Sequence, residues 1–171
     1  MTLREQSIVC LVILALIGCS AEPSPAAGRT TEDTGTIVVQ ASKLRNSKGR
    51  VGILLFDSSE GFPSGAGTAI RVRRLAPKGE SVTIRFKSVP YGEYAVSVLH
   101  DENDNRELDT NFFGLPKEGY GVSRNPKPGF GPPAYDEAVF TLDGPEKTLE
   151  IKVLYLDEMA EERGYRESPG Q

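Results

Sequence analysis

Oxygen-bearing side chains recur at alternate positions in one short stretch of the chain, residues 100–111 (HDENDNRELDTN). The spacing is that of an EF-hand-type calcium loop: Asp101, Asn103, Asn105 and Asp109 stand at positions 1, 3, 5 and 9, and the main-chain carbonyl of Glu107 stands at position 7. Calcium prefers roughly six to eight hard oxygen ligands, which alternate residues of a tight loop can supply together. Calcium is therefore the one cofactor that the sequence suggests.

The loop departs from the EF-hand pattern at two positions. Arg106 stands where glycine eases the sharp turn, and Phe112 stands where a bidentate glutamate belongs. A carboxylate from elsewhere, such as Glu118 or Asp136, would have to complete the ligand shell. The competing interpretations are an Asp/Asn-rich turn whose side chains bond their own backbone, and a solvated acidic loop. The sequence leaves these interpretations open, and it predicts weak calcium affinity, about 0.1–1 mM.

His100 and Asp101 are neighbours that invite comparison with a catalytic pair. They end a predicted strand, however, and adjacent strand residues point to opposite faces of a sheet. No Gly-x-Ser-x-Gly motif and no cysteine nucleophile accompanies them. We therefore predict that the protein is not an enzyme and has no catalytic residues.

Three aromatic residues, Tyr120, Phe130 and Tyr135, lie in a glycine- and proline-rich stretch that follows the Asp/Asn loop. Loops at the end of a β-sandwich often bind ligands, so these rings are a candidate platform for a glycan or a peptide. The other interpretation is an apolar plug that ties the long loop to the domain. We favour the plug, because so many apolar groups in one loop need burial.

Composition narrows the class of partner. The 171 residues carry a formal net charge of -4, which argues against nucleic acid, since phosphate binding requires a basic surplus. A single histidine excludes a histidine cluster for zinc or copper.

The N-terminus is typical of an export signal. Residues 7–18 (SIVCLVILALIG) form an apolar run that is too short for a transmembrane helix but has the length of a signal-peptide core. The run ends in Leu16-Ile17-Gly18-Cys19, which resembles a bacterial lipobox and predicts lipid on Cys19. We expect a signal peptide over 1–18, a disordered tether over 19–35, and a protein held by its lipid in the cell envelope. In a Gram-negative cell, Ser20 after the cysteine favours the periplasmic face of the outer membrane.

Period-two hydrophobic patterns begin at Thr36 and predict a domain over 36–156, followed by a flexible tail over 157–171. The pattern predicts an all-β, antiparallel sandwich of about seven strands, immunoglobulin-like or prealbumin-like, with one long Gly/Pro/aromatic loop. Residues 69–75 and 81–88 are expected to pair as a hairpin, with Ile70 and Val72 facing inward and Arg71 and Arg73 outward. The expected strands are 36–43, 50–57, 69–75, 81–88, 93–100, 137–142 and 147–156.

Several of these segments, taken in order, resemble the uncharacterised bacterial family known as domain of unknown function 2141. The segments are GILLFD (52–57), EGFP (60–63), FKSVPYGEYAV (86–96), HDEN (100–103), LDTN (108–111), GLPKEGYG (114–121) and AVF (138–140). The resemblance covers about 36–156 and implies an exported β-sandwich protein. It implies no activity. The function we expect is therefore a non-enzymatic, lipid-anchored envelope module with an unknown protein or glycan partner; the alternative is a glycan- or peptide-binding protein that uses the aromatic loop.

Overall fold

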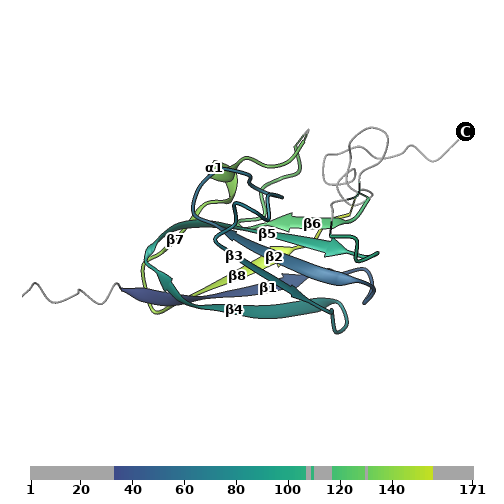
Figure 1. Cartoon of the computed structure of the whole chain (residues 1–171), viewed down its shortest axis with the longest axis horizontal. Coiled ribbons are helices and arrows are strands. Elements are labelled where there is room, and N and C mark those ends of the chain that lie inside the picture. Colours follow the sequence, from purple (N-terminus) through teal and green to yellow (C-terminus); the bar gives the residue numbers. More distant parts are fainter. Residues whose placement is uncertain (1–32, 107–108, 110–116, 130, 156–171) are drawn as a thin grey trace, which may run out of the picture. The chain divides into compact units, whose positions relative to one another are not determined.

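A computed structural model describes residues 33–106, 109, 117–129 and 131–155 (Figure 1). The chain divides into two compact units, Met1–Thr30 and Thr31–Gln171, and every described residue belongs to the second. The predicted signal peptide, lipidated Cys19 and tail lie outside the described residues, as do Glu107 and Phe130. Among the described residues, no helix has the length and apolar character needed to cross a membrane.

The described residues form eight strands and one short helix. The strands are β1 (Thr34–Ser42), β2 (Arg50–Phe56), β3 (Arg71–Leu75), β4 (Ser81–Pro90), β5 (Gly92–Asp101), β6 (Gly119–Val122), β7 (Phe140–Leu142) and β8 (Glu146–Lys152). The helix α1 (Tyr135–Ala138) lies between β6 and β7.

Two sheets form the layers of the fold, which confirms the all-β prediction (Figure 1). The smaller sheet has the order β4-β1-β8, and the larger has the order β3-β2-β5-β6, with β7 paired to β5. β2 is a central strand, as its two apolar faces predicted. One pair departs from the expected antiparallel pattern, because β1 and β8 run parallel from Thr36↔Glu146 to Ser42↔Lys152.

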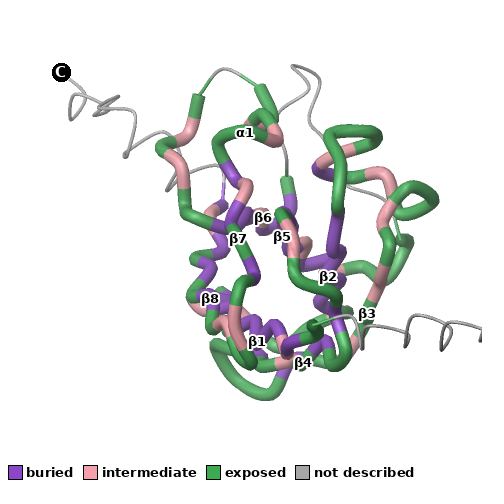
Figure 2. Tube along the Cα trace, turned by 90° about the vertical axis from the view of Figure 1, so that its left-hand side faces the viewer, coloured by how far each residue is buried: buried purple, intermediate pink, exposed green. Residues whose placement is uncertain are grey.

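The core lies between the two sheets, and Figure 2 shows the buried residues along their strands. Ile37, Phe86 and Ile151 from the smaller sheet are fully buried, as are Ile53 and Val98 from the larger. Burial of apolar area on this scale is the main favourable term in folding, at about 25 cal/mol per Å². Apolar and polar side chains alternate along these strands. A shift of one residue in register would expose the apolar side chains to solvent, so the alternation determines the register.

The predicted hairpin of 69–75 with 81–88 is wrong. β3 pairs with β2, and β4 pairs with β1, so the two strands belong to different sheets. The predicted facing of β3 is wrong as well: Arg71 and Arg73 lie opposite Leu55 and Ile53, which are core residues, and Ile70 is exposed. An edge strand can tolerate arginine on its inner face, because the long side chain reaches past the apolar edge to polar groups.

The inward arginines of β3 reach across to the edge of β4. Arg71 donates to the main-chain carbonyls of Lys87 and Ser88, both at 3.0 Å. The guanidinium carbon of Arg73 lies 6.0 Å from the centre of the Phe86 ring. These contacts close one side of the sandwich without a strand-to-strand ladder.

Strand β6 and helix α1 were not predicted, since 101–136 was expected to be one long loop and 137–142 a strand. Glu137 and Ala138 belong to the helix instead, and β7 begins at Phe140. β6 is a Gly-Tyr-Gly-Val segment, and its glycines face inward opposite His100 and Val98. A Cβ on Gly119 would collide with Tyr155 and Val153, and one on Gly121 would collide with the main chain of Lys152. The two glycines therefore allow β6 to approach the end of β8, and Tyr120 and Leu154 pair there as an isolated bridge.

Candidate functional site

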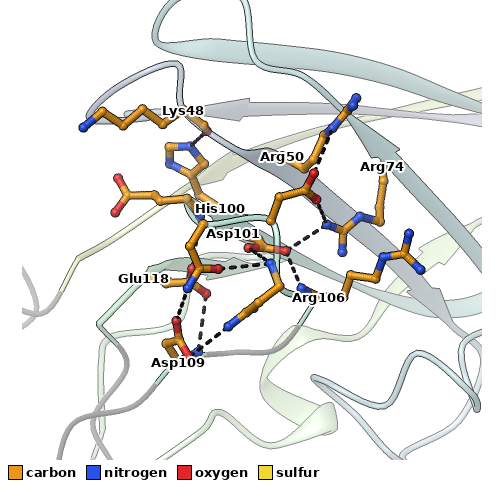
Figure 3. A network of polar contacts seen from close by, with 12 residues as sticks. Lys48, Arg50, Arg74, His100, Asp101, Arg106, Asp109 and Glu118 are labelled. Carbon is orange, nitrogen blue, oxygen red and sulfur yellow. Dashed lines mark hydrogen bonds and ion pairs between the residues drawn. The ribbon is translucent and has the colours of Figure 1, made fainter.

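His100 and Asp101 project from opposite faces of β5, as strand alternation predicted (Figure 3). His100 pairs with Val51 on the inner face, whereas Asp101 pairs with Arg50 at the end of the strand. Both side chains are fully buried. The two neighbours therefore belong to separate hydrogen-bond networks and do not form a catalytic pair.

Both ring nitrogens of His100 have partners within the chain. Nε2 lies 3.0 Å from the main-chain carbonyl of Lys48, and Nδ1 lies 2.7 Å from the hydroxyl of Tyr155. A carbonyl can only accept, so Nε2 donates to Lys48, while Nδ1 shares a hydrogen bond with the tyrosine hydroxyl. The Tyr155 hydroxyl in turn accepts from the main-chain amide of Arg45 at 3.0 Å. These contacts fix the orientation of the imidazole ring and tie β5 to the segment after β8.

Asp101 anchors the start of the Asp/Asn loop. Its Oδ1 accepts from the amide of Asn105 at 3.1 Å, and its Oδ2 accepts from the amide of Arg106 at 2.9 Å and from Arg74 at 2.8 Å. Burial by itself would raise the pKa of Asp101, but the Arg106 amide, Arg74 and the Asn105 amide together hold the pKa below its ordinary value. The carboxylate is therefore ionised, and its hydrogen bonds with the amides of Asn105 and Arg106 hold the turn that follows Asp101.

The loop backbone turns sharply where the sequence departs from the calcium motif. Asp104 and Arg106 both have left-handed backbone conformations, with φ of 58° and 71°. Glycine adopts φ > 0 without steric cost, whereas other residues adopt it rarely. Arg106 therefore occupies the conformation for which an EF-hand-type loop uses glycine, and the two amides donated to Asp101 compensate the turn.

The predicted side-chain ligands do converge. The carboxamide nitrogens of Asn103 and Asn105 donate to Asp109, at 2.6 Å and 3.1 Å, and the Asn105 amide also bonds Asn103 Oδ1 at 3.1 Å. Together with the Asn105–Asp101 bond, these contacts unite four of the five predicted positions in one network. The fifth, Glu107, lies outside the described residues.

Glu118 is a buried carboxylate beneath this loop (Figure 3). Its Oε1 accepts from the amide of Glu102 at 3.0 Å, and its Oε2 accepts from the amide of Asp109 at 3.4 Å. Burial raises the pKa of Glu118 above its ordinary value; the two amides oppose that shift, while Asp101 and Asp109 add to it. Of the two carboxylates suggested to complete a ligand shell, Glu118 reaches the loop, whereas Asp136 belongs to α1.

Two arginines that were not predicted as site residues, Arg74 and Arg45, bind the outer side of the loop. Arg74 also donates to Asp104 at 2.6 Å, and Arg45 forms a bidentate pair with Glu102. The Arg45 side chain and the Asn46 amide lower the pKa of Glu102, against the effect of burial. Each of these partners lies at least 27 positions away in sequence, so only the fold brings them together.

In this arrangement the carboxylates of the loop are bonded by arginine side chains and by amide N–H groups of the same chain. The loop uses the Asp/Asn side chains as hydrogen-bond partners of its own backbone, which is the first alternative considered for this stretch. Within residues 33–106, 109, 117–129 and 131–155, no three His, Cys, Asp or Glu side chains are grouped so as to hold a metal ion. Calcium binding by Asp101, Asn103, Asn105 and Asp109 stays a prediction.

Two of the three predicted aromatic residues, Tyr120 and Tyr135, are described, and they pack against the outer face of the larger sheet. Tyr120 and Tyr135 are partly buried and pack with Phe62 against a small cluster of Ala95, Val122 and Ala138. Phe62 meets Tyr135 edge to face, with ring centres 5.7 Å apart. The Tyr120 hydroxyl is buried, and none of the described residues hydrogen-bonds it. These contacts are those of a plug; a role in ligand binding stays a prediction.

Comparison with curated proteins gives no match, and comparison with solved structures gives none. Comparison with protein families gives a match that spans residues 39–150 and includes β2 to β7, the last part of β1 and most of β8. That span contains the Asp/Asn loop, Arg74 and Glu118, and it covers more than half of the 171 residues. The chain therefore belongs to the family described as "Uncharacterized protein conserved in bacteria (DUF2141)".

Proposed function

We propose that this protein is a non-enzymatic module of the bacterial cell envelope, exported by its N-terminal signal and held at a membrane by lipid on Cys19. Its β-sandwich serves as a binding or accessory domain for another envelope component. The family match supports a bacterial setting, and the apolar run ending at Cys19 supports export and lipidation.

One observation carries the non-enzymatic part of the proposal. The only histidine in the chain is fully buried, and both of its ring nitrogens bond groups of the same chain. A general base must reach a proton of its substrate directly or through one water molecule. His100 is instead committed to Tyr155 and Lys48, and Asp101 is committed to Arg74 and two main-chain amides.

Expression of the native chain and of Cys19→Ala in a bacterial host tests the anchor. Metabolic labelling with a radioactive fatty acid is expected to label the native chain in the membrane fraction. The Cys19→Ala variant is expected to lose the label and to leave the membrane fraction. Membrane association that survives Cys19→Ala, or native protein confined to the cytoplasm, would refute the proposal.

Calcium binding at the Asp/Asn loop is a second candidate function. It is favoured by the convergence of Asn103 and Asn105 on Asp109, which collects oxygen-bearing side chains above the Glu118 carboxylate. In this arrangement the carboxamide N–H groups of the two asparagines hydrogen-bond the Asp109 oxygens, which a cation would otherwise bind. Rotation of either carboxamide would present an oxygen to the same space.

Calorimetric titration with calcium and with magnesium distinguishes a loop that binds calcium from a loop held by its own hydrogen bonds. If calcium binds, Asp109→Asn should abolish the heat, whereas Asp104→Asn, which alters a carboxylate paired with Arg74, should retain it. Calcium at ten times its Kd should then stabilise the protein by about 1.4 kcal/mol. No heat and no rise in melting temperature with millimolar calcium would eliminate calcium binding and leave the loop as a hydrogen-bonded turn.

A further inference from the structure

The sandwich has an open side between β7 and β8, which are consecutive strands in different sheets. An open hollow of about 550 Å³ lies there. Its apolar lining comes from Val139, Phe140 and Leu149. Arg124 and Lys147 supply positive charge to the lining, and Asp143 and Glu150 supply negative charge. The side between β3 and β4 differs, because Arg71 closes it by donating to two carbonyls of β4.

At one end of the outer edge of β8, the side chain of Asn125 makes the two hydrogen bonds that the backbone of a neighbouring strand would make. Its Nδ2 donates to the carbonyl of Glu150 at 2.8 Å, and its Oδ1 accepts from the amide of Lys152 at 2.8 Å. Beyond it, Leu154 exchanges two main-chain bonds with Tyr120, each at 2.9 Å. The outer edge is therefore satisfied from the Glu150 carbonyl onward.

Upstream of the Glu150 carbonyl, no hydrogen bond to the described part of the chain occupies the same edge at Thr148. Main-chain groups of a strand alternate between its two sides, and the Val153 amide bonds Ser42 of β1. The even-numbered residues of β8 thus direct their N–H and C=O groups outward, as the contacts of Glu150 and Lys152 with Asn125 show. Among the described residues none bonds the amide or carbonyl of Thr148 or the amide of Glu150. These three groups form a short docking ladder beside the hollow.

Charge on the outer face of β8 selects the occupant. Glu146 and Glu150 flank Thr148, and all three side chains are exposed. A second copy paired antiparallel about Thr148 would place Glu146 opposite Glu150, and like charges directly opposite one another destabilise a strand pair. Glu146 is already paired with Arg85 at 2.7 Å. Glu150 therefore offers a negative charge to a basic residue on an incoming strand.

We propose that the edge of β8 at Thr148 accepts an extended segment of a partner protein as an added strand. That segment carries a basic residue opposite Glu150. The residues of that segment that lie opposite Lys147 and Leu149 are apolar and enter the hollow. Main-chain hydrogen bonds give such an interaction its affinity, and the alternate side chains give it specificity.

Amide hydrogen exchange in the full chain, purified in detergent micelles, tests this proposal with two synthetic peptides. The probe is acetyl-KVTVKV-amide, and the control is acetyl-EVTVEV-amide. Slower exchange of the Thr148 and Glu150 amides with the basic peptide, and not with the acidic one, is the expected result. No protection with either peptide in large excess overturns the proposal. Equal protection by both overturns the charge selection, and protection that grows with protein concentration alone identifies a second copy as the occupant and overturns the partner assignment.

Matched variants separate edge pairing from loss of fold. Thr148→Pro removes the outward amide without touching a bond to β1, so it should abolish protection at Glu150, whereas Thr148→Val should retain it. Glu150→Gln should weaken the basic peptide about two- to fivefold, since an opposite-charge pair on a sheet is worth that much. Glu150→Lys should reverse the preference toward the acidic peptide. Unchanged affinity for both peptides in Glu150→Lys would contradict the proposal.

Discussion

The guanidinium of Arg74 lies 2.8 Å from the carboxylate of Asp101 and thereby links β3 to β5 across the strand that separates them, β2. Gly52 of β2 pairs with Arg74 on one side and with Leu99 on the other, so no side chain stands in the path of the guanidinium. The Asp101 side chain is fully buried, and that of Arg74 is 28% exposed. This pair is the point at which the Asp/Asn loop is fastened to the sheet.

Removal of Arg74 should therefore cost far more stability than removal of an exposed arginine. We expect Arg74→Met to lower the free energy of unfolding by about 3 kcal/mol, because it leaves a buried carboxylate without its cation. Arg85→Met is the matched control, since both members of the Arg85–Glu146 pair are about half exposed and such pairs are worth about 1 kcal/mol or less. Urea unfolding measures both, and equal losses would contradict the role given to Arg74.

Acid should destabilise the domain through Asp101. Its pKa in the folded protein is lower than the ordinary value of 3.8, so its contribution to stability is present above that pH and is lost as the pH falls through the folded pKa. We expect unfolding free energy measured between pH 5 and pH 2, a window of about three units around carboxyl pKa values, to decline in the native chain. The decline should be shallower in Asp101→Asn; an identical slope would contradict the assignment.

Glu118 should affect the pH dependence of the unfolding free energy in the direction opposite to Asp101. Its folded pKa is raised above the ordinary 4.5, so its stabilising contribution is present below that value and is lost as the pH rises through the folded pKa. Replacement by glutamine removes this gain on acidification. The acid decline should therefore be steeper in Glu118→Gln than in the native chain, and a shallower decline would show that Glu118 is not held with a raised pKa.

Removal of the hydroxyl group should destabilise the protein at Tyr155 but not at Tyr120. Tyr155→Phe removes the hydroxyl that bonds His100 and the Arg45 amide, and it should cost about 1–3 kcal/mol because a buried ring nitrogen is left without a partner. Tyr120→Phe removes a buried hydroxyl that no described residue bonds, and should be neutral or stabilising. Thermal and urea unfolding of both variants decides the matter. A large loss in Tyr120→Phe would reveal a hydrogen-bond partner for that hydroxyl.

Asn125 should matter for its amide as well as for its backbone conformation. It has φ of 47°, which asparagine tolerates better than most residues, and its side chain makes both bonds to β8. Asn125→Gly preserves the conformation but loses both bonds, for an expected cost of about 1–3 kcal/mol. Asn125→Asp keeps only the bond from the Lys152 amide and should cost an intermediate amount. Faster exchange at Lys152 in the glycine variant would confirm the contact, and an unchanged rate would contradict it.

The sequence predicted most of the strands because their burial follows simple alternation. β1, β2, β4 and β5 lie where period-two patterns placed them. β6 was missed because Gly-Tyr-Gly-Val is typical of a turn; its glycines are explained only by the approach of Tyr155 and Lys152. The false hairpin arose because a short turn between two alternating segments favours direct pairing, whereas here the turn carries the chain from one sheet to the other.

The candidate site was predictable in outline only. Alternation correctly separated His100 from Asp101, and the spacing of Asp101, Asn103, Asn105 and Asp109 correctly indicated that they form one loop. The arginines that bind the loop were not predictable, because Arg74 and Arg45 lie 27 and 57 positions from their carboxylate partners in the chain. Local patterns carry no information about such pairs, and the assignment of faces in β3 had even placed Arg71 and Arg73 on the wrong side.

The mass of the mature protein tests the central proposal of a lipid-anchored envelope module most directly. Intact mass spectrometry of the chain extracted from bacterial membranes should give a polypeptide that begins at Cys19 and carries the added mass of a diacylglyceryl group. Digestion should place that mass on the N-terminal peptide. A chain that retains residues 1–18, or one that begins elsewhere and has no lipid, would contradict the proposal.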